Sequence, residues 1–347
     1  MQAREAGKQP GVRRAQCVVP ATPKGEIASY CWVSEREVLL WRVDANDAAF
    51  PVPSTSKPST SSGAYRWFNR ATGQESIVAP LEKRFGIPFL MDARFSPDRA
   101  WLLWWDGFKK RGFCASVTSV TGNSVASWPQ EEPARLQWFP DNRHFLVVSD
   151  TPRLPGRSRD AAQKGADALA CVYGTDGKMR ARTRLRSVPV GPQYSAPQAV
   201  SHQIAAVYDF NPRWEMEPRE RRAGRLNLWQ WRVRPGNVFP VRRTLRFPKG
   251  ATLNGVLLSP WGGRIACWFQ FARGTAAAQG TATAGDSLWT ISLQDGMFRT
   301  VTSLDEVYAA HPCSGSLPET IHSLQWLPDG KHLSFLYCGS LYTVSAG

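Results

Sequence analysis

The stretch "FSPDRAWLLWW" at residues 95–105 decides the fold, because its pattern returns along the chain. Clear copies are "WFPDNRHFLVV" at 138–148, "LSPWGGRIACWF" at 258–269 and "WLPDGKHLSFLY" at 326–337, and weaker copies stand at 30–41 and 197–208. Each copy joins an apolar strand end to a tight turn and then to a second apolar run. Pro presets φ for the turn, Asp or Asn bonds its own backbone, and Gly supplies a positive φ. The pattern therefore predicts six repeated units.

Each unit continues into further strand-like segments joined by short turns. In the second unit, 114–120 and 124–128 flank Thr121-Gly122-Asn123, which is typical of a hairpin. Four antiparallel strands per unit is the blade of a β-propeller. Runs such as 145–148 are continuously apolar, so they predict burial on both faces, as in stacked blades. The 15 Trp and 16 Phe residues suit the wide space between blades.

The predicted fold class is all-β: a six-bladed β-propeller with four antiparallel strands per blade, in one domain over 1–347. The last unit lacks a strand, and "RRAQCVVP" at 13–20 is expected to supply it as the outer strand and close the ring. Closure would remove an exposed sheet edge. Short helices fit the connections at 158–170 and 215–224. The expected blades are approximately 26–80, 91–128, 134–185, 196–245, 251–302, and 321–345 plus 13–20.

The repeated turn motif resembles the bacterial propeller repeat of TolB-like proteins and of propeller domains attached to some serine peptidases. The resemblance covers nearly the whole chain and is WD-repeat-like only in outline. No Gly-His opens a blade, and Trp105-Asp106 ends a second strand, which is the wrong place for the WD signature. The resemblance implies a propeller that chiefly binds other proteins. TolB-like proteins are typically periplasmic.

The chain carries no enzyme signature that we recognise. It contains neither the G-x-S-x-G elbow of serine hydrolases nor the S-x-D-x-G-x-T-W box of sialidase-like propellers. We therefore expect a non-catalytic scaffold for protein–protein interaction, without a catalytic residue. The alternative is a propeller enzyme, or a metal- or sugar-binding protein, that uses acids at the channel mouth. Cys313 and Cys338 could meet as a disulfide, or with His311 and His322 as a zinc set, although the spacing matches no standard finger.

Four acids stand at comparable positions, where a second strand meets its long loop. Converging carboxylates there could hold Ca²⁺, the one cofactor that the sequence suggests. The other interpretation is that Asp favours strand ends, where it bonds the backbone locally. The loops at 44–63, 150–168, 209–224 and 271–286 are long, which predicts that their face is the working one. The four acids are Asp44, Asp106, Asp150 and Asp209.

The net charge of +15 is concentrated in one part of the chain. Between residues 178 and 249 there are sixteen Lys or Arg residues and four acids. Four arginines alternate and so project from one face of an expected outer strand, and two more extend the basic surface onto the next blade. This pattern favours an acidic protein, an anionic membrane surface or nucleic acid, and of these we expect an acidic protein partner. Coding bias towards Arg and protection of a strand edge are the alternative explanations. The residues are Arg180, Arg182, Arg184, Arg186, Arg242 and Arg243.

The remaining expectations concern other partners and the compartment. Nucleic acid is not favoured as a partner, because no aromatic stacking motif follows the charge. There is no run of eighteen apolar residues that could span a membrane, and the N-terminus lacks the apolar core of a signal peptide. We expect a monomer that is cytoplasmic as the sequence stands, or periplasmic if the true start lies upstream.

Overall fold

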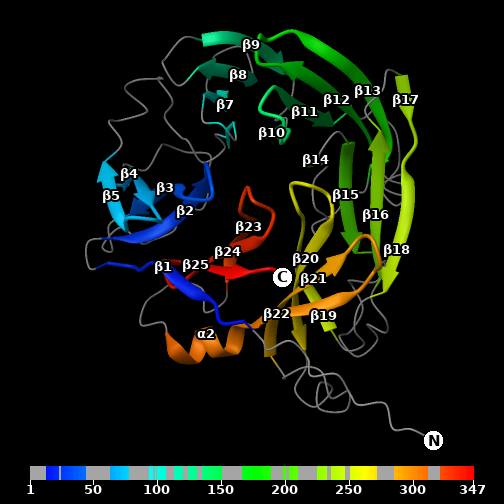
Figure 1. Ribbon diagram of the computed structural model, residues 1–347. Coiled ribbons are helices and arrows are strands. Elements are labelled where there is room, and N and C mark those ends of the chain that lie inside the picture. The colour runs from blue at the N-terminus through cyan, green and yellow to red at the C-terminus, as the bar shows by residue number, and fades with distance from the viewer. Residues whose placement is uncertain are drawn as a thin grey trace, which may run out of the picture.

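The structure of the 347-residue chain is a computed structural model. The structure describes residues 13–22, 25–43, 63–77, 94–96, 98, 100–106, 113–119, 124–130, 135–150, 166–188, 198–200, 203–209, 225–232, 236–246, 251–271, 285–311 and 321–347. Across these residues the fold is all-β, as predicted, with one helix, α2 (Leu304–Ala310). Figure 1 shows the sheets arranged around a common centre, as in a propeller.

The described strands form six sheets, five of four strands and one of five. Within a sheet, consecutive strands pair antiparallel. The two exceptions to consecutive order are β1 and β17. The sheets are β2 (Glu26–Trp32), β3 (Glu37–Val43), β4 (Gly63–Asn69) and β5 (Gln74–Ile77); β6 (Arg94–Phe95), β7 (Trp101–Asp106), β8 (Phe113–Ser119) and β9 (Ser124–Gln130); β10 (Arg135–Trp138), β11 (His144–Asp150), β12 (Ala166–Gly174), β13 (Met179–Val188) and β17 (Gly236–Val238); β14 (Gln198–Val200), β15 (Gln203–Asp209), β16 (Arg225–Arg232) and β18 (Val241–Arg246); β19 (Ala251–Leu258), β20 (Arg264–Phe271), β21 (Gly285–Ser292) and β22 (Phe298–Ser303); and β23 (His322–Trp326), β24 (His332–Tyr337), β25 (Ser340–Ser345) and β1 (Gln16–Val19).

The repeated turn motif works as its residue types predict. The carboxylate of Asp141 accepts hydrogen bonds from the backbone N–H groups two and three positions later, at 2.9 and 3.0 Å. Asp329 does the same in its own copy, at 2.7 and 3.1 Å. The residue after each Asp adopts the left-handed conformation, with φ of 61° at Asn142 and 63° at Gly330. Asn and Gly are the residue types that tolerate this conformation, so the motif encodes the turn.

The core lies between neighbouring sheets. Leu102, Leu103 and Phe145 are fully buried, as expected for continuously apolar strands. Side chains of adjacent sheets also bond each other: Trp32 donates to Ser334 across the boundary between the first and last sheets, at 2.8 Å. The sheets therefore pack face to face through large side chains.

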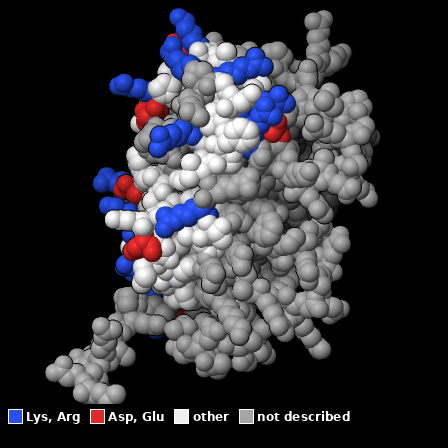
Figure 2. Space-filling view, turned by 90° about the vertical axis from the view of Figure 1, so that its right-hand side faces the viewer, with Lys and Arg blue, Asp and Glu red and all other residues white. Residues whose placement is uncertain are grey.

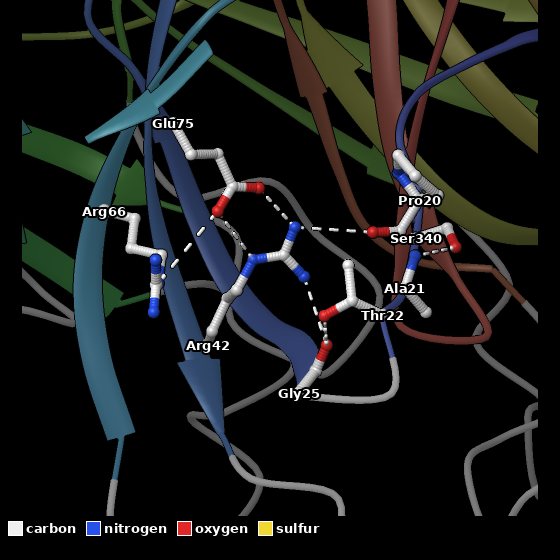
Figure 3. A network of polar contacts seen from close by, with 8 residues as sticks. All are labelled: Pro20, Ala21, Thr22, Gly25, Arg42, Arg66, Glu75 and Ser340. Atoms are coloured by element: carbon white, nitrogen blue, oxygen red, sulfur yellow. Dashed lines mark hydrogen bonds and ion pairs between the residues drawn. The ribbon is translucent and has the colours of Figure 1, made fainter. Parts of the chain in front are cut away.

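The two ends of the described chain lie in one sheet. β1 pairs antiparallel with β25, and its Val19 is 1% exposed. Beyond β1, the backbone N–H of Ala21 donates to the hydroxyl of Ser340 at 2.7 Å. Arg42 of β3 is buried and donates to Pro20 at 3.3 Å, so the segment after β1 is also held to the first sheet (Figure 3).

Two sequence predictions need correction. Residues 166–170 of the helix expected at 158–170 form the start of β12, because a long apolar strand continues through them. The remainder of that helix and the helix at 215–224 lie outside the described residues. β13, expected at an outer edge, is covered in part by β17, which pairs with it in parallel from Thr183 to Leu185.

Candidate functional site

The row of four arginines lies on β13 as the alternation predicts. Arg180, Arg182 and Arg184 are exposed and Arg186 is partly exposed, whereas the intervening Leu185 is fully buried. Strand geometry sets this pattern, because successive side chains point to opposite faces. Figure 2 shows Lys and Arg side chains spread over the described part of this side of the molecule.

Acids pair with this row more closely than the sequence suggested. Asp176 in the β12–β13 turn bonds Arg180 at 2.7 Å. Asp167 of β12 lies 3.3 Å from both Arg184 and Arg186. Two carboxylates therefore lie beside the row, because β12 and its turn into β13 bring them there. Arg182 has no ion pair among the described residues.

Three groups on β12 and in the β12–β13 turn have shifted pKa values. Cys171 of β12 is the register partner of Arg182, and burial raises the pKa of the Cys171 thiol although the charge of Arg182 opposes the rise. Burial also raises the pKa of Tyr173 to about 12. Hydrogen bonding from the backbone of Lys178, with the charge of Arg180, lowers the pKa of Asp176. Near neutral pH the row therefore faces neutral Cys171 and Tyr173 and an ionised Asp176.

The next sheet extends the basic surface. Arg242 and Arg243 both lie on β18, and Arg243 is exposed. Only the backbone of Arg242 is described. The guanidinium of Arg243 donates to the backbone carbonyl of Leu293 in the following sheet. We call Arg180, Arg182, Arg184, Arg186, Arg242 and Arg243 together the basic rim.

Large apolar side chains are exposed at turns of these sheets. In an antiparallel sheet of four consecutive strands, the first and third turns lie at one end. Five exposed residues lie in or beside such turns of three sheets: Met179, Phe239, Val241, Trp261 and Met297. Sequence reasoning missed this set, because exposure of a lone apolar residue has no signature in the pattern. The sequence had indicated the opposite face of the molecule as the working surface. The long loops of that face lie almost entirely outside the described residues.

The four acids predicted to share a cation are only partly placed. Asp106, Asp150 and Asp209 are the last residues of β7, β11 and β15, each the second strand of its sheet. Asp44 and the side chains of the other three lie outside the described residues. Within the described part of the chain, no group of three or more His, Cys, Asp or Glu side chains could hold a metal. The cation site stays a prediction.

A buried acid that the sequence did not single out lies at the start of β21. Asp286 is 5% exposed and accepts a hydrogen bond from the hydroxyl of Tyr308 in α2, at 3.0 Å. Burial raises the pKa of Asp286, and burial together with this carboxyl raises the pKa of Tyr308. Asp305 in the same helix accepts from the backbone N–H of Asp286 at 3.3 Å. These bonds fasten α2 to β21.

Two turn histidines, Cys338 and His311 have local roles. His144 and His332 each bond the Asp of their own turn, at 2.6 and 2.5 Å. Cys338 is disulfide-bonded, so it is not a thiolate for the suggested zinc set. Cys313, its expected partner, lies outside the described residues. The ring of His311 contacts Tyr342, with centroids 5.6 Å apart.

Known proteins show likeness to this chain in fold alone. No family model matches the chain, and no curated protein matches it in sequence. Similar solved structures include TolB from Acinetobacter baumannii, at 11% identity and a TM-score of 0.45, over 94% of this chain and 65% of that one. Pyrococcus horikoshii acylaminoacyl peptidase gives 14% and 0.45, over 90% of this chain and 42% of that one. An oligogalacturonate lyase in complex with manganese gives 10% and 0.46, over 98% and 95%.

The chain spans less than two thirds of the length of these TolB and peptidase chains. The similar structures include peptidases and a lyase as well as TolB, so the likeness does not assign an activity to this chain. Among the described residues, no helix has the length and apolar character needed to cross a membrane.

Proposed function

We propose that the chain is one domain, a six-bladed ring closed by β1, and that it is a non-catalytic scaffold which binds an acidic protein partner through the basic rim. The observation that carries this proposal is the row on β13: Arg182 and Arg184 are exposed beside Arg180 and Arg186, on one face of a strand whose other face is buried at Thr183 and Leu185. Alternate residues on a strand are about 7 Å apart. A regular row of guanidinium groups presents bidentate donors to carboxylates.

The acids in the row do not cancel its charge. Two carboxylates, Asp167 and Asp176, stand beside four arginines, and Arg182 lies between the paired positions. Such surface pairs are weak, at about 0–1 kcal/mol each, so a partner's carboxylates can replace them at little cost. We propose that the protein binds its partner as a monomer, in the compartment where that partner is found.

Binding to the basic rim should depend strongly on salt. We expect the protein to bind poly-L-glutamate at low ionic strength and to lose this binding steeply as NaCl is raised, since exposed charges are screened. Replacing Arg180, Arg182, Arg184 and Arg186 by Ser should weaken binding about tenfold, if each contact contributes about 0.4 kcal/mol. The melting temperature should hardly change. Fluorescence anisotropy and thermal melts measure the two effects.

The control removes the same charge elsewhere. Arg14, Arg36, Arg299 and Lys331 are exposed and lie outside the basic rim. Their replacement by Ser should weaken binding much less than the β13 set, although the net charge is equal. Equal losses in the two variants would mean that poly-L-glutamate responds to net charge alone, and the scaffold proposal would lose its binding surface.

The alternative is a ligand- or metal-binding propeller, and the position of three acids at the ends of second strands supports it. If Asp44, Asp106, Asp150 and Asp209 share Ca²⁺, the ion at one hundred times its Kd should stabilise the fold by about 2.7 kcal/mol. EDTA should reverse the rise in melting temperature. If no divalent ion changes the melting temperature of the chelated protein, the acids are strand-end residues that hold no cation, and the scaffold is favoured.

A further inference from the structure

Three large apolar side chains stand beside the arginines of the basic rim. Phe239, Val241 and Met297 are 71%, 65% and 56% exposed. Single exposed apolar residues are ordinary on protein surfaces. Their distribution is informative here, because the contacts between sheets bring them to one stretch of surface beside the arginines.

The first link in that surface is the parallel pairing of β17 with β13. The ladder ends with Leu185 opposite Val238, so Phe239 follows directly on Val238 as Arg186 follows on Leu185. Trp231 of β16 is fully buried and donates to the carbonyl of Arg186 at 3.4 Å, which fixes the two sheets against each other. Phe239 is therefore held next to the end of the arginine row.

The second link joins β18 to the turn before β22. Val241 and Arg243 are two residues apart on β18, so both project from the same face. The guanidinium of Arg243 donates to the carbonyl of Leu293 and lies 4.0 Å from where a Cβ on Gly296 would stand. Met297 follows Gly296. Apolar and basic side chains thus lie near one another over three sheets.

We infer that the partner is an acidic peptide segment that also carries large apolar side chains, bound along β13 and across Phe239, Val241 and Met297. This inference rests on the proposed function and specifies its partner. A purely acidic partner would leave the apolar side chains in water, whereas burying them strengthens binding. Aromatic and Met side chains mixed with Arg are enriched at protein interfaces. The two-residue spacing of the arginines matches the side-chain period of an extended peptide, which favours a peptide over a lipid surface.

The test compares two synthetic peptides of equal length and charge. One alternates Glu with Leu and the other alternates Glu with Ser. The Glu–Leu peptide should bind about tenfold more tightly, as expected for burial of one or two apolar side chains, and the ratio should persist at high salt. Phe239→Ser with Val241→Ser should remove this advantage and leave binding of the Glu–Ser peptide unchanged.

Met179→Ser is the matched control. Met179 is 53% exposed and begins β13, seven residues before Arg186 and so about 23 Å away along the strand. Its replacement should leave the preference for the Glu–Leu peptide intact. A similar loss in this variant would show that the advantage does not come from the surface at Phe239.

The outcomes separate the inference from the proposed function. If both peptides bind equally and need the arginines, the acidic partner stands and the apolar contribution is wrong. If neither peptide binds, both proposals fail. Binding to vesicles containing phosphatidylserine, lost in the Phe239 and Val241 variant while the peptides do not discriminate, would replace the peptide with a lipid surface.

Discussion

Deletion of residues 1–20 is expected to lower the melting temperature by about 5 °C. The deletion removes β1, with the buried side chain of Val19 and the ladder to β25. Burial of a Val contributes about 1.5–3 kcal/mol and each ladder hydrogen bond about 1 kcal/mol, so the loss is about 4 kcal/mol. For a chain of this length, that corresponds to about 5 °C. Calorimetry of the two purified chains measures it.

Deletion of residues 1–12 is the control, because it retains β1. Its melting curve should match that of the full chain. The longer deletion also leaves β25 as an uncovered edge, so it should show concentration-dependent association in sedimentation. A Δ1–20 chain that melts like the full chain and stays monomeric would mean that β1 contributes nothing to the fold.

Replacement of Arg42 by Ala is expected to cost about 3 kcal/mol of unfolding free energy. Arg42 is 7% exposed, bonds both carboxylate oxygens of Glu75, and donates to Gly25 at 3.1 Å and to Pro20 at 3.3 Å (Figure 3). Removing one partner of a buried ion pair costs about 3–5 kcal/mol, and the lower value applies because Glu75 is 24% exposed. Urea denaturation measures the change.

Arg66→Ala tests whether burial or charge carries the effect. Arg66 is 36% exposed and lies 4.0 Å from the same carboxylate of Glu75. As a surface pair it should contribute about 0–1 kcal/mol. Arg42→Lys should remain destabilised, since an ammonium does not reproduce four directed hydrogen bonds. Equal losses for Arg42→Ala and Arg66→Ala would show that Arg42 does not fasten the segment after β1.

The all-β class followed from the sequence because turn chemistry is local. Asp141 and Asp329 bond N–H groups within three residues, and the left-handed positions take Asn or Gly. Because each of these requirements is met by residues close together in the chain, the turn appears in the sequence as a short motif that recurs. The shared face of the arginines on β13 was also predicted from the sequence, because strand geometry alone sends alternate side chains to one face.

The parts that were not predicted depend on contacts between segments distant in the chain. β17 pairs with β13 over three residues and in parallel, which no local pattern marks. Asp167 reaches two arginines at an irregularity in the β12–β13 register between Ala166 and Ala168. The apolar part of the candidate site was missed for the same reason, since Phe239 gains its basic neighbours only through β17.

We propose that the chain closes on itself through β1, so that the sheets bearing the basic rim are held in one ring. Cys17 and Tyr342 are register partners in the β1–β25 ladder, and facing residues of an antiparallel pair lie within disulfide range. Tyr342→Cys should therefore form an intramolecular disulfide with Cys17 under mild oxidation, seen by peptide mass mapping. Ser345→Cys, three residues further along β25, should not. A Cys17 that stays free in the Tyr342→Cys protein, or bonds only between molecules, would contradict closure by β1.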